Sequence, residues 1–301
     1  MKKNVALLFL LYTLLINNAL LCQSSITPSL ASPSLKRYMS MKDALLNPDS
    51  VYYLNLFLVT ESNADTFNLN INKLRNLKYL ALGVCSIRRL PDGISELAYL
   101  EQVKLEASFK LDIEDCINVL SKCSNLKEIS FANDSLKYLS NNINLLKNVT
   151  KLNISGNQIQ YLPAEFFELN KLTTLLWNNN DINTISKEFR NLEQLEELSL
   201  NYNSNMNLVE VLSVLGTLPK LKYLGLIDNN LQKIPSQIRL CHSLETLNLS
   251  MNQLQHLPDE ITELNRLTFI ILLGNNFSND EIERIKEKMT NCFVIWGKRN
   301  D

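Results

Sequence analysis

Residues 146–166 read LKNVTKLNISGNQIQYLPAEF, and their apolar side chains recur at fixed distances around Asn157. The same spacing returns at residues 169–189, where the last apolar position has slipped by one, and again at residues 241–261. Repeats of this kind start at residues 48, 74, 97, 123, 146, 169, 192, 218, 241 and 264. Their steps of 23 or 26 residues indicate a solenoid built from stacked repeats.

Each repeat contains the pattern of a short strand followed by a turn. Positions seven and nine are apolar and alternate with polar ones, which predicts a strand with one buried face. The amide of an Asn at position twelve can bond the backbone of its own turn and of the next one. We therefore expect a ladder of Asn157, Asn180, Asn203, Asn229, Asn252 and Asn275. The earlier repeats are less regular at this position, with Val59, Cys85, Ser108 and Asp134.

The repeated motif L-x-x-L-x-x-L-x-L-x-x-N-x-L-x-x-L-P resembles the 23-residue form of the leucine-rich repeat family. The resemblance covers about three quarters of the chain and is closest to exported bacterial proteins of that family. It implies an α/β solenoid, a horseshoe with a parallel concave sheet, mostly extended convex segments and helical caps.

The longer repeats and the two ends depart from this regular pattern. Apolar residues at helical spacing predict convex helices at Asp112–Leu120 and Leu208–Leu215, whereas Glu61–Thr66 looks like a loop. A cap helix is expected within residues 37–47, before the repeats at 48–278. The C-terminal cap, residues 279–301, combines a helix that begins at Asn279 with a strand-like segment from Cys292 to Trp296.

The N-terminus predicts export. Lys2 and Lys3 precede an apolar run, Val5–Leu15, that is too short to cross a membrane comfortably, so residues 1–22 are typical of a secretory signal peptide. Residues 23–36 form a Ser/Pro-rich spacer. The sequence predicts a secreted or cell-envelope protein, with no transmembrane span in the mature chain. Lipidation of Cys22 is a less favoured alternative, because Leu21 stands where a bacterial lipoprotein has a small residue. A cytoplasmic protein is the other alternative.

Composition argues against catalysis and nucleic-acid binding. The 301 residues include 59 Leu and 39 Asn but only 7 Gly, and 30 basic residues balance 31 acidic ones. A nucleic-acid surface needs a basic excess, and a phosphate-binding loop needs Gly. No C-x-x-C or catalytic motif occurs, so we expect no metal, no cofactor and no enzymatic activity. The two histidines, His242 and His256, are expected on the surface, and Cys116 and Cys123 either pack in the core or pair.

A binding surface is expected on the concave face, at strand positions six, eight, ten and eleven. Three groups of side chains occupy these positions: an aromatic group of Tyr53, Phe57 and Tyr79; a polar centre of Asn153, Asn178, Asn179 and Asn201; and a C-terminal group of Tyr202, Tyr223, Ile227 and Asp228. Aromatic side chains on a polar surface are common binding anchors. The alternative is that the tyrosines only stabilise neighbouring strands. Phe269, Ile271 and Leu273 are either a further patch or covered by the C-terminal segment.

The sequence thus predicts a non-catalytic exported interaction module that binds a protein or a glycan through its concave face. A structural or lipid-anchored cell-envelope protein is the first alternative. An intracellular signalling scaffold is the second, if the N-terminus is not an export signal.

Overall fold

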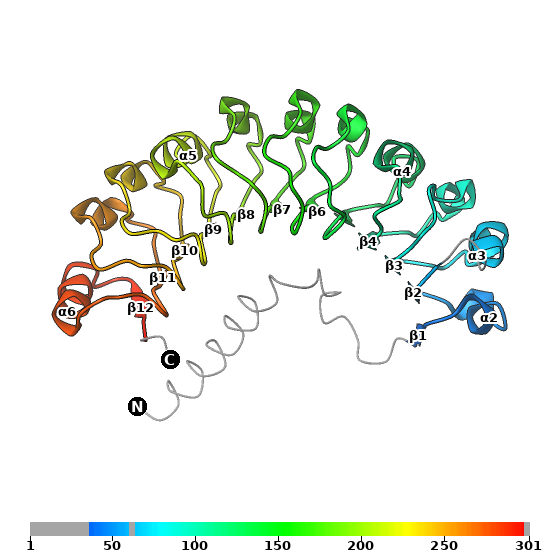
Figure 1. The fold of residues 1–301 in the computed structure, drawn as a ribbon, viewed down its shortest axis with the longest axis horizontal. Helices are drawn as coiled ribbons and strands as arrows, with labels where there is room; N and C mark the ends of the chain where they lie inside the picture. Colours follow the sequence, from blue (N-terminus) through cyan, green and yellow to red (C-terminus); the bar gives the residue numbers. More distant parts are fainter. Residues whose placement is uncertain (1–35, 60–63, 298–301) are drawn as a thin grey trace. The chain divides into compact units, whose positions relative to one another are not determined.

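The computed structural model describes residues 36–59 and 64–297, which belong to one compact unit. The expected signal peptide and almost all of the expected spacer lie outside the described residues. Each repeat of this unit adds one turn to an arc, with the strands on its inner, concave side and the helices on its outer, convex side (Figure 1). The arrangement is the α/β solenoid with a parallel concave sheet that the repeats predict.

The described residues contain one sheet of twelve parallel strands in chain order. The strands are β1 (Arg37–Tyr38), β2 (Tyr53–Phe57), β3 (Tyr79–Gly83), β4 (Gln102–Glu106), β5 (Glu128–Ser130), β6 (Lys151–Asn153), β7 (Thr174–Leu176), β8 (Glu197–Ser199), β9 (Tyr223–Gly225), β10 (Thr246–Asn248), β11 (Phe269–Ile271) and β12 (Phe293–Ile295). Equal positions of neighbouring repeats pair, so that Leu152 lies between Ile129 and Leu175. A side chain at a given repeat position therefore lies in one row across the whole sheet.

The convex segments coil more than the sequence indicated. Most of them contain a short 3-10 helix: η1 (Pro48–Ser50), η2 (Ile71–Lys73), η3 (Asp92–Glu96), η4 (Asn141–Leu145), η5 (Ala164–Glu168), η6 (Lys187–Asn191), η7 (Ser236–Leu240) and η8 (Asp259–Glu263). The convex segments were expected to be mostly extended, and this is correct only up to the proline that follows position seventeen of the repeat. Pro163 itself is extended, but its carbonyl then accepts a hydrogen bond from Phe166 N at 3.0 Å and closes a 3-10 turn.

The 26-residue repeats carry α-helices on the convex side. The predicted helices are confirmed as α4 (Ile113–Leu120) and α5 (Leu208–Leu215), capped by the side chains of Asp112 and Asn207. The loop predicted at Glu61–Thr66 is wrong from residue 64 onward, where α3 (Ala64–Asn70) begins. Ala64, Phe67 and Ile71 are buried, and their spacing of three and four residues was the helical signal.

The N-terminal cap differs from the helix expected within residues 37–47. Arg37 and Tyr38 instead pair with Tyr53 and Leu54 of β2. The helix, α2, covers only Met41–Ala44 because the Ser40 side chain accepts a bond from Asp43 N and fixes the helix start there. Met41 and Ala44 are buried, so this short helix still closes the end of the core.

The C-terminal cap consists of α6 (Asn279–Lys288) and β12, as the sequence predicted. Ser278 caps α6 by accepting a bond from Glu281 N at 3.2 Å. The buried Glu281 accepts hydrogen bonds from Leu257 N and from Arg284, and Arg284 also donates to Leu257 O at 2.8 Å. These bonds attach the cap helix to the last turn of the array.

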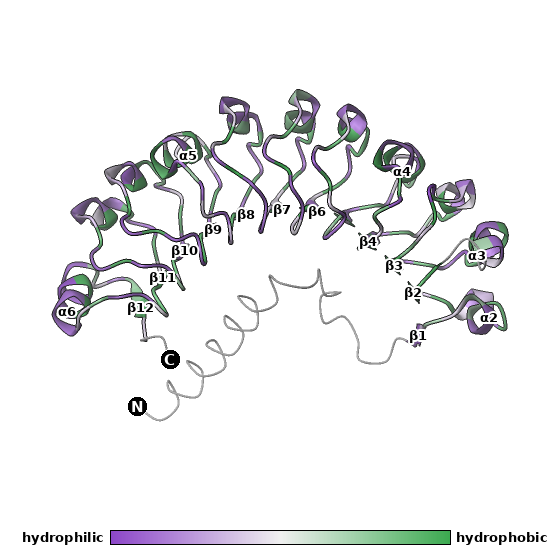
Figure 2. Ribbon diagram, in the orientation of Figure 1, coloured by the Kyte–Doolittle hydropathy of each residue, from purple (hydrophilic) through white to green (hydrophobic). Residues whose placement is uncertain are grey.

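Leu and Ile from successive repeats form one continuous core between the sheet and the convex segments. In every turn, hydrophobic residues alternate with hydrophilic ones (Figure 2). Trp177 is buried, as expected, and stacks on Phe189 with ring centroids 6.4 Å apart. Cys116 and Cys123 are both buried free thiols, so core packing is confirmed and their pairing is not.

Candidate functional site

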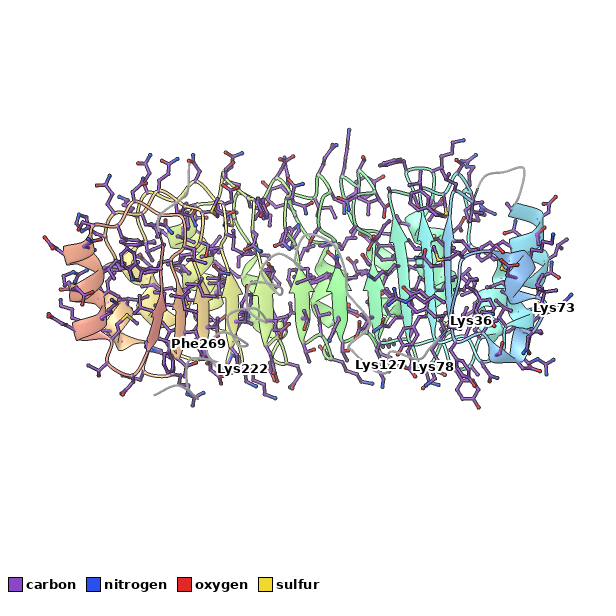
Figure 3. The ribbon with its side chains drawn as sticks, turned by 90° about the horizontal axis from the view of Figure 1, so that it is seen from below. Lys36, Lys73, Lys78, Lys127, Lys222 and Phe269 are labelled. Atoms are coloured by element: carbon purple, nitrogen blue, oxygen red, sulfur yellow. The ribbon has the colours of Figure 1, made fainter. Side chains whose placement is uncertain are left out.

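The concave face is arranged in rows because the strands pair at equal repeat positions. Position six forms the row at the start of the strands, which includes Tyr53, Tyr79, Tyr223 and Phe269. The preceding residues Lys78, Lys127 and Lys222 lie along the same edge of the sheet (Figure 3). Lys78 pairs with Glu101 at 3.2 Å and Lys222 with Glu196 at 2.9 Å, so charges at this edge are partly matched between repeats.

The first expected group, Tyr53, Phe57 and Tyr79, lies on β2 and β3. The rings of Tyr53 and Tyr79 face each other with centroids 5.8 Å apart, and the Arg37 guanidinium lies 5.2 Å from the Tyr53 centroid. Phe57 is 64% exposed. A Cβ on Gly83 would come within 2.9 Å of the Phe57 ring, so this ring lies over the neighbouring strand because Gly83 has no side chain. The structure therefore brings these aromatic side chains onto one surface.

The expected polar centre needs a correction, because Asn153, Asn178 and Asn201 are buried rather than exposed. Their amides bond the backbone: Asn178 Oδ1 accepts from Asn201 N at 2.9 Å, and Asn201 Oδ1 accepts from Ile227 N at 2.8 Å. Asn153 Oδ1 accepts from Ser155 N at 3.0 Å. These side chains turn along the sheet to satisfy buried donors. In the centre of the face, Asn179 remains exposed.

The C-terminal group is split by the structure. Tyr202 and Asp228 occupy position eleven of adjacent repeats, after the strands, and Tyr202 N donates to Ile227 O at 2.8 Å. Tyr223 begins β9, five positions earlier in the repeat and about 16 Å away along the strand at ~3.3 Å per residue. Its ring folds back over Gly225, where a Cβ would lie 3.2 Å from it. Asp228 is exposed, whereas Ile227 is buried.

The Asn side chains at position twelve bond the backbone of two repeats at once. Asn157 Nδ2 donates to Ile154 O in its own repeat and to Phe131 O in the preceding one, while its Oδ1 accepts from Asp134 N and Leu136 N. Cross-repeat bonds recur for the other members, which are Asn180, Asn203, Asn229, Asn252 and Asn275. In the earlier repeats, the Ser108 hydroxyl donates to Glu106 O of its own repeat. The Cys85 thiol contacts Gly83 O of its own repeat and also the Val59 backbone and the Ser108 side chain of the two neighbouring repeats.

Three charged side chains that are buried or half-buried, Asp134, Lys104 and Glu281, were not predicted from the sequence. Burial raises the pKa of Asp134 to about 7, and burial also lowers the pKa of Lys104 on β4. Hydrogen bonds from Arg284 lower the pKa of Glu281 to about 2. For Asp134, the sequence did contain a signal. It occupies a position of the Asn ladder, where an acid replaces an amide that donates hydrogen bonds.

Reactive groups do not converge in the described part of the chain. No cluster of three or more His, Cys, Asp or Glu that could hold a metal occurs there. Burial raises the pKa of the Cys116 and Cys241 thiols to about 12 and of Cys123 and Cys292 to about 11, which disfavours the nucleophilic thiolate. His242 and His256 are exposed, and His256 Nδ1 lies 3.3 Å from Glu281. Within residues 36–59 and 64–297, no helix is long and apolar enough to cross a membrane.

A curved parallel sheet with one short strand per repeat and an Asn ladder defines a solenoid of the leucine-rich repeat class. The family model described as leucine rich repeat matches residues 147–204 and 219–277. These two segments of the chain are leucine-rich repeats. No curated protein sequence matches it significantly.

Solved structures with a similar fold come from distant organisms. A chain of the Drosophila Toll–Spatzle complex is 20% identical over 87% of this chain and 38% of its own length, with a TM-score of 0.60. An internalin from Listeria monocytogenes is 19% identical over 84% of this chain and 82% of its own, with a TM-score of 0.49. A leucine-rich repeat protein of Leptospira interrogans is 18% identical, covering 86% and 99%, with a TM-score of 0.37. At 20% identity, the likeness to the chain of the Toll–Spatzle complex shows the fold alone.

Proposed function

We propose that this chain is an exported, non-catalytic module that binds a protein partner through the concave face, with its principal anchor at Tyr53, Phe57 and Tyr79. The observation that carries the proposal is the exposed Phe57 ring, held over Gly83 beside two half-buried tyrosines. An aromatic ring that is fixed before binding loses little conformational freedom in a complex, which favours its use as an anchor.

The packing of the tyrosines supports a protein rather than a glycan. A sugar ring stacks on the open face of an aromatic side chain. Here the Tyr53 ring has Tyr79 at 5.8 Å and the Arg37 guanidinium at 5.2 Å, so its faces are occupied within the molecule. This surface therefore offers ring edges, hydroxyl groups and the apolar side chain of Phe57. A protein partner can match them with apolar side chains and hydrogen-bonding groups of its own.

The experiment is a binding assay with the purified array, residues 23–301, against proteins of the native cell envelope, followed by titration of each captured protein. Phe57→Ala should weaken binding of the true partner at least tenfold, which corresponds to about 1.4 kcal/mol. Tyr161→Ala is the matched control, since Tyr161 is 63% exposed but follows the ladder position of its repeat and lies off the strands. Equal affinity of the two variants for every captured protein would rule out this anchor.

We propose a second area of the concave face that contacts the same partner, formed by Tyr202, Tyr223 and Asp228. Because Tyr202 and Asp228 lie together at the strand ends and Tyr223 lies at the strand starts, the two variants Tyr202→Ala and Tyr223→Ala should weaken binding independently. A double variant with wild-type affinity would remove this area from the site.

Export is proposed from Lys2, Lys3 and the apolar run Val5–Leu15. Mass spectrometry of the N-terminus of the protein from its native source tests this proposal. A free N-terminus shortly after residue 22 is expected. A lipid on Cys22 would favour the anchored cell-envelope protein instead, and an intact Met1 would favour the intracellular scaffold.

A further inference from the structure

The C-terminal end of the array leaves part of its core uncovered. Val294 of β12 pairs in register with Ile270 and continues the row of Leu224, Leu247 and Ile270, which are fully buried. Val294 itself is only half-buried, as are Cys292 and Trp296. At the other end Tyr38, Met41 and Ala44 are all buried. Solenoid ends need a cover for their core, and only the N-terminal cap supplies a complete one.

The outer edge of β12 also presents backbone groups for strand pairing. Phe293 N donates to Thr268 O at 2.8 Å, and Ile295 O accepts from Leu272 N at 2.7 Å, so both residues direct their backbone bonds towards β11. Because these bonds alternate along a strand, the N–H and C=O of Val294 point to the opposite side. In the described part of the chain no strand follows β12 in the sheet.

Apart from its length of only three residues, this edge lacks the features that normally prevent strand addition. Edge strands are usually protected by charged side chains, proline or extreme shortness. β1, at the other end of the sheet, has two residues, one of which is Arg37. The segment Cys292–Gly297 contains neither a charged residue nor a proline, and the Phe293 side chain is 57% exposed.

We propose that a second copy of this chain docks on this edge, with the two β12 strands antiparallel about a twofold axis at Val294. The two Val294 residues then exchange N–H···O=C bonds, which join the two concave sheets edge to edge. Phe293 of each copy lies opposite Ile295 of the other on the concave face. The segment C-F-V-I-W is apolar on both sides of its centre, so this antiparallel pairing sets apolar side chains against apolar ones throughout.

The charges around the edge fit the same symmetry. α6 runs alongside the strands (Figure 3), and a twofold axis perpendicular to the strands reverses its direction in the second copy. The acidic start of one α6, with Asp280, then faces the basic end of the other, where Lys286 and Lys288 also pair with Glu283 and Asp259 of their own copy.

The size of the contact predicts a weak dimer that forms as concentration rises. A short strand and its neighbours bury less than the ~1,200 Å² of a standard stable interface. Sedimentation equilibrium of residues 23–301 over about a hundred-fold range of concentration should therefore show a reversible shift from monomer to dimer. A monomer throughout the range, or an assembly larger than a dimer, would overturn the proposal.

The variant Phe293→Lys places a charge opposite Ile295 of the second copy and should weaken association at least tenfold. Phe109→Lys is the matched control, because Phe109 is a similarly exposed Phe that follows β4, far along the sheet from β12, and it should leave association unchanged. Retained dimerisation of Phe293→Lys, or equal loss in both variants, would contradict the edge assignment. Circular dichroism checks that both variants are folded.

Cross-linking tests the register without relying on a destabilised variant. In a Cys292→Ser background, Val294→Cys should form an intermolecular disulfide on mild oxidation, because paired residues of antiparallel strands lie within disulfide reach. Thr290→Cys, exposed just before the strand, should cross-link at least tenfold more slowly. Equal rates would rule out this register. No partner protein enters these experiments, so their outcome is independent of the proposed concave-face function.

Discussion

At the scale of single residues, Asp134 stands out because it is an acid within a ladder of amides. Its Oδ1 accepts from Ser108 N at 2.6 Å, but its buried Oδ2 has no hydrogen-bond partner. In the next repeat the corresponding atom is Nδ2 of Asn157, which donates to three carbonyl oxygens. A protonated Asp134 can supply such a donor, whereas a carboxylate sets its negative charge against carbonyl oxygens. Burial of this carboxyl, with a smaller contribution from the negative charge of Glu106, raises the pKa of Asp134 to about 7.

The raised pKa makes stability depend on pH. The unfolded carboxyl titrates near its ordinary value of 3.8, so the stabilisation by neutral Asp134 is complete below that pH and is lost as pH rises through about 7. Asp134→Asn supplies the donor at every pH. We expect it to raise the free energy of unfolding at pH 8 by about 4 kcal/mol, since the two pKa values differ by about three and each pKa unit is worth ~1.4 kcal/mol, and to have little effect near pH 4. Urea unfolding at both pH values measures this difference, and a pH-independent effect would contradict it.

Ladder and concave-face asparagines should differ in their contribution to stability. Asn203 Nδ2 donates to the carbonyls of Trp177, Leu200 and Asn201, and its Oδ1 accepts from Asn180 N. Asn203→Ala leaves all these buried groups unsatisfied and should cost about 3 kcal/mol or more. Asn153→Ala is the comparison, since the Asn153 side chain accepts from Ser155 N and should cost about 1 kcal/mol. Chemical denaturation measures both, and equal losses would show that cross-repeat bonds have no special weight.

At the scale of elements, α6 is attached to the array in part by the Glu281–Arg284 ion pair, because both of these helix residues also bond the backbone of Leu257. Arg284 donates to both carboxylate oxygens of Glu281, at 2.6 and 2.8 Å, and Leu257 N donates to Oε1 at 3.1 Å. These bonds lower the pKa of Glu281 from 4.5 to about 2. The stabilisation is therefore complete above pH 4.5 and is lost as pH falls through about 2.

Glu281→Gln should reduce stability at pH 7 by about 2 kcal/mol, because the neutral amide accepts less strongly from Arg284 and places a donor near it. The loss should shrink as pH falls from 4.5 towards 2. Glu283→Gln, on the exposed side of the same helix, should cost less than about 0.5 kcal/mol. Thermal unfolding followed by circular dichroism at pH 7 and pH 3 checks both variants. A loss for Glu281→Gln that does not change with pH would exclude the ion pair as its cause.

The elements also show which features of the structure a sequence contains. Repeat spacing was sufficient for the strands and their register, because a strand position recurs identically in each turn. Repeat spacing was insufficient to predict the burial of Asn178 and Asn201, since this burial depends on their amides turning towards the next strand. The helix α3 was missed although Ala64, Phe67 and Ile71 carried its spacing. The N-terminal cap was misjudged because the pairing of Arg37 and Tyr38 with β2 is a tertiary contact that local periodicity does not encode.

At the scale of the whole molecule, the two halves of the array are coupled unequally. In a solenoid, stability is approximately a sum of repeat terms and nearest-neighbour terms. From Asn157 onward each ladder amide donates to a carbonyl of the preceding repeat, as Asn180 does to Ile154 O. Val59 has no polar side-chain atom, and Cys85 and Ser108 contact carbonyls of their own repeats. The N-terminal repeats therefore gain less from the amide ladder, although β2, β3 and β4 pair over five residues and β9, β10 and β11 over three.

Native-state hydrogen exchange should reveal this gradient. Amides of β2–β4 should exchange at least tenfold faster than those of β9–β11, because local opening from the N-terminal end breaks fewer bonds of the amide ladder between repeats. Both strand sets lie near an end of the array, so end fraying alone predicts similar rates. The double variant Cys85→Asn with Ser108→Asn should slow exchange of β3 and β4 while leaving β9–β11 unchanged, because each new amide can donate to the preceding repeat. Equal protection of both sets in the wild type would mean that apolar packing, and not the ladder, sets the coupling between repeats.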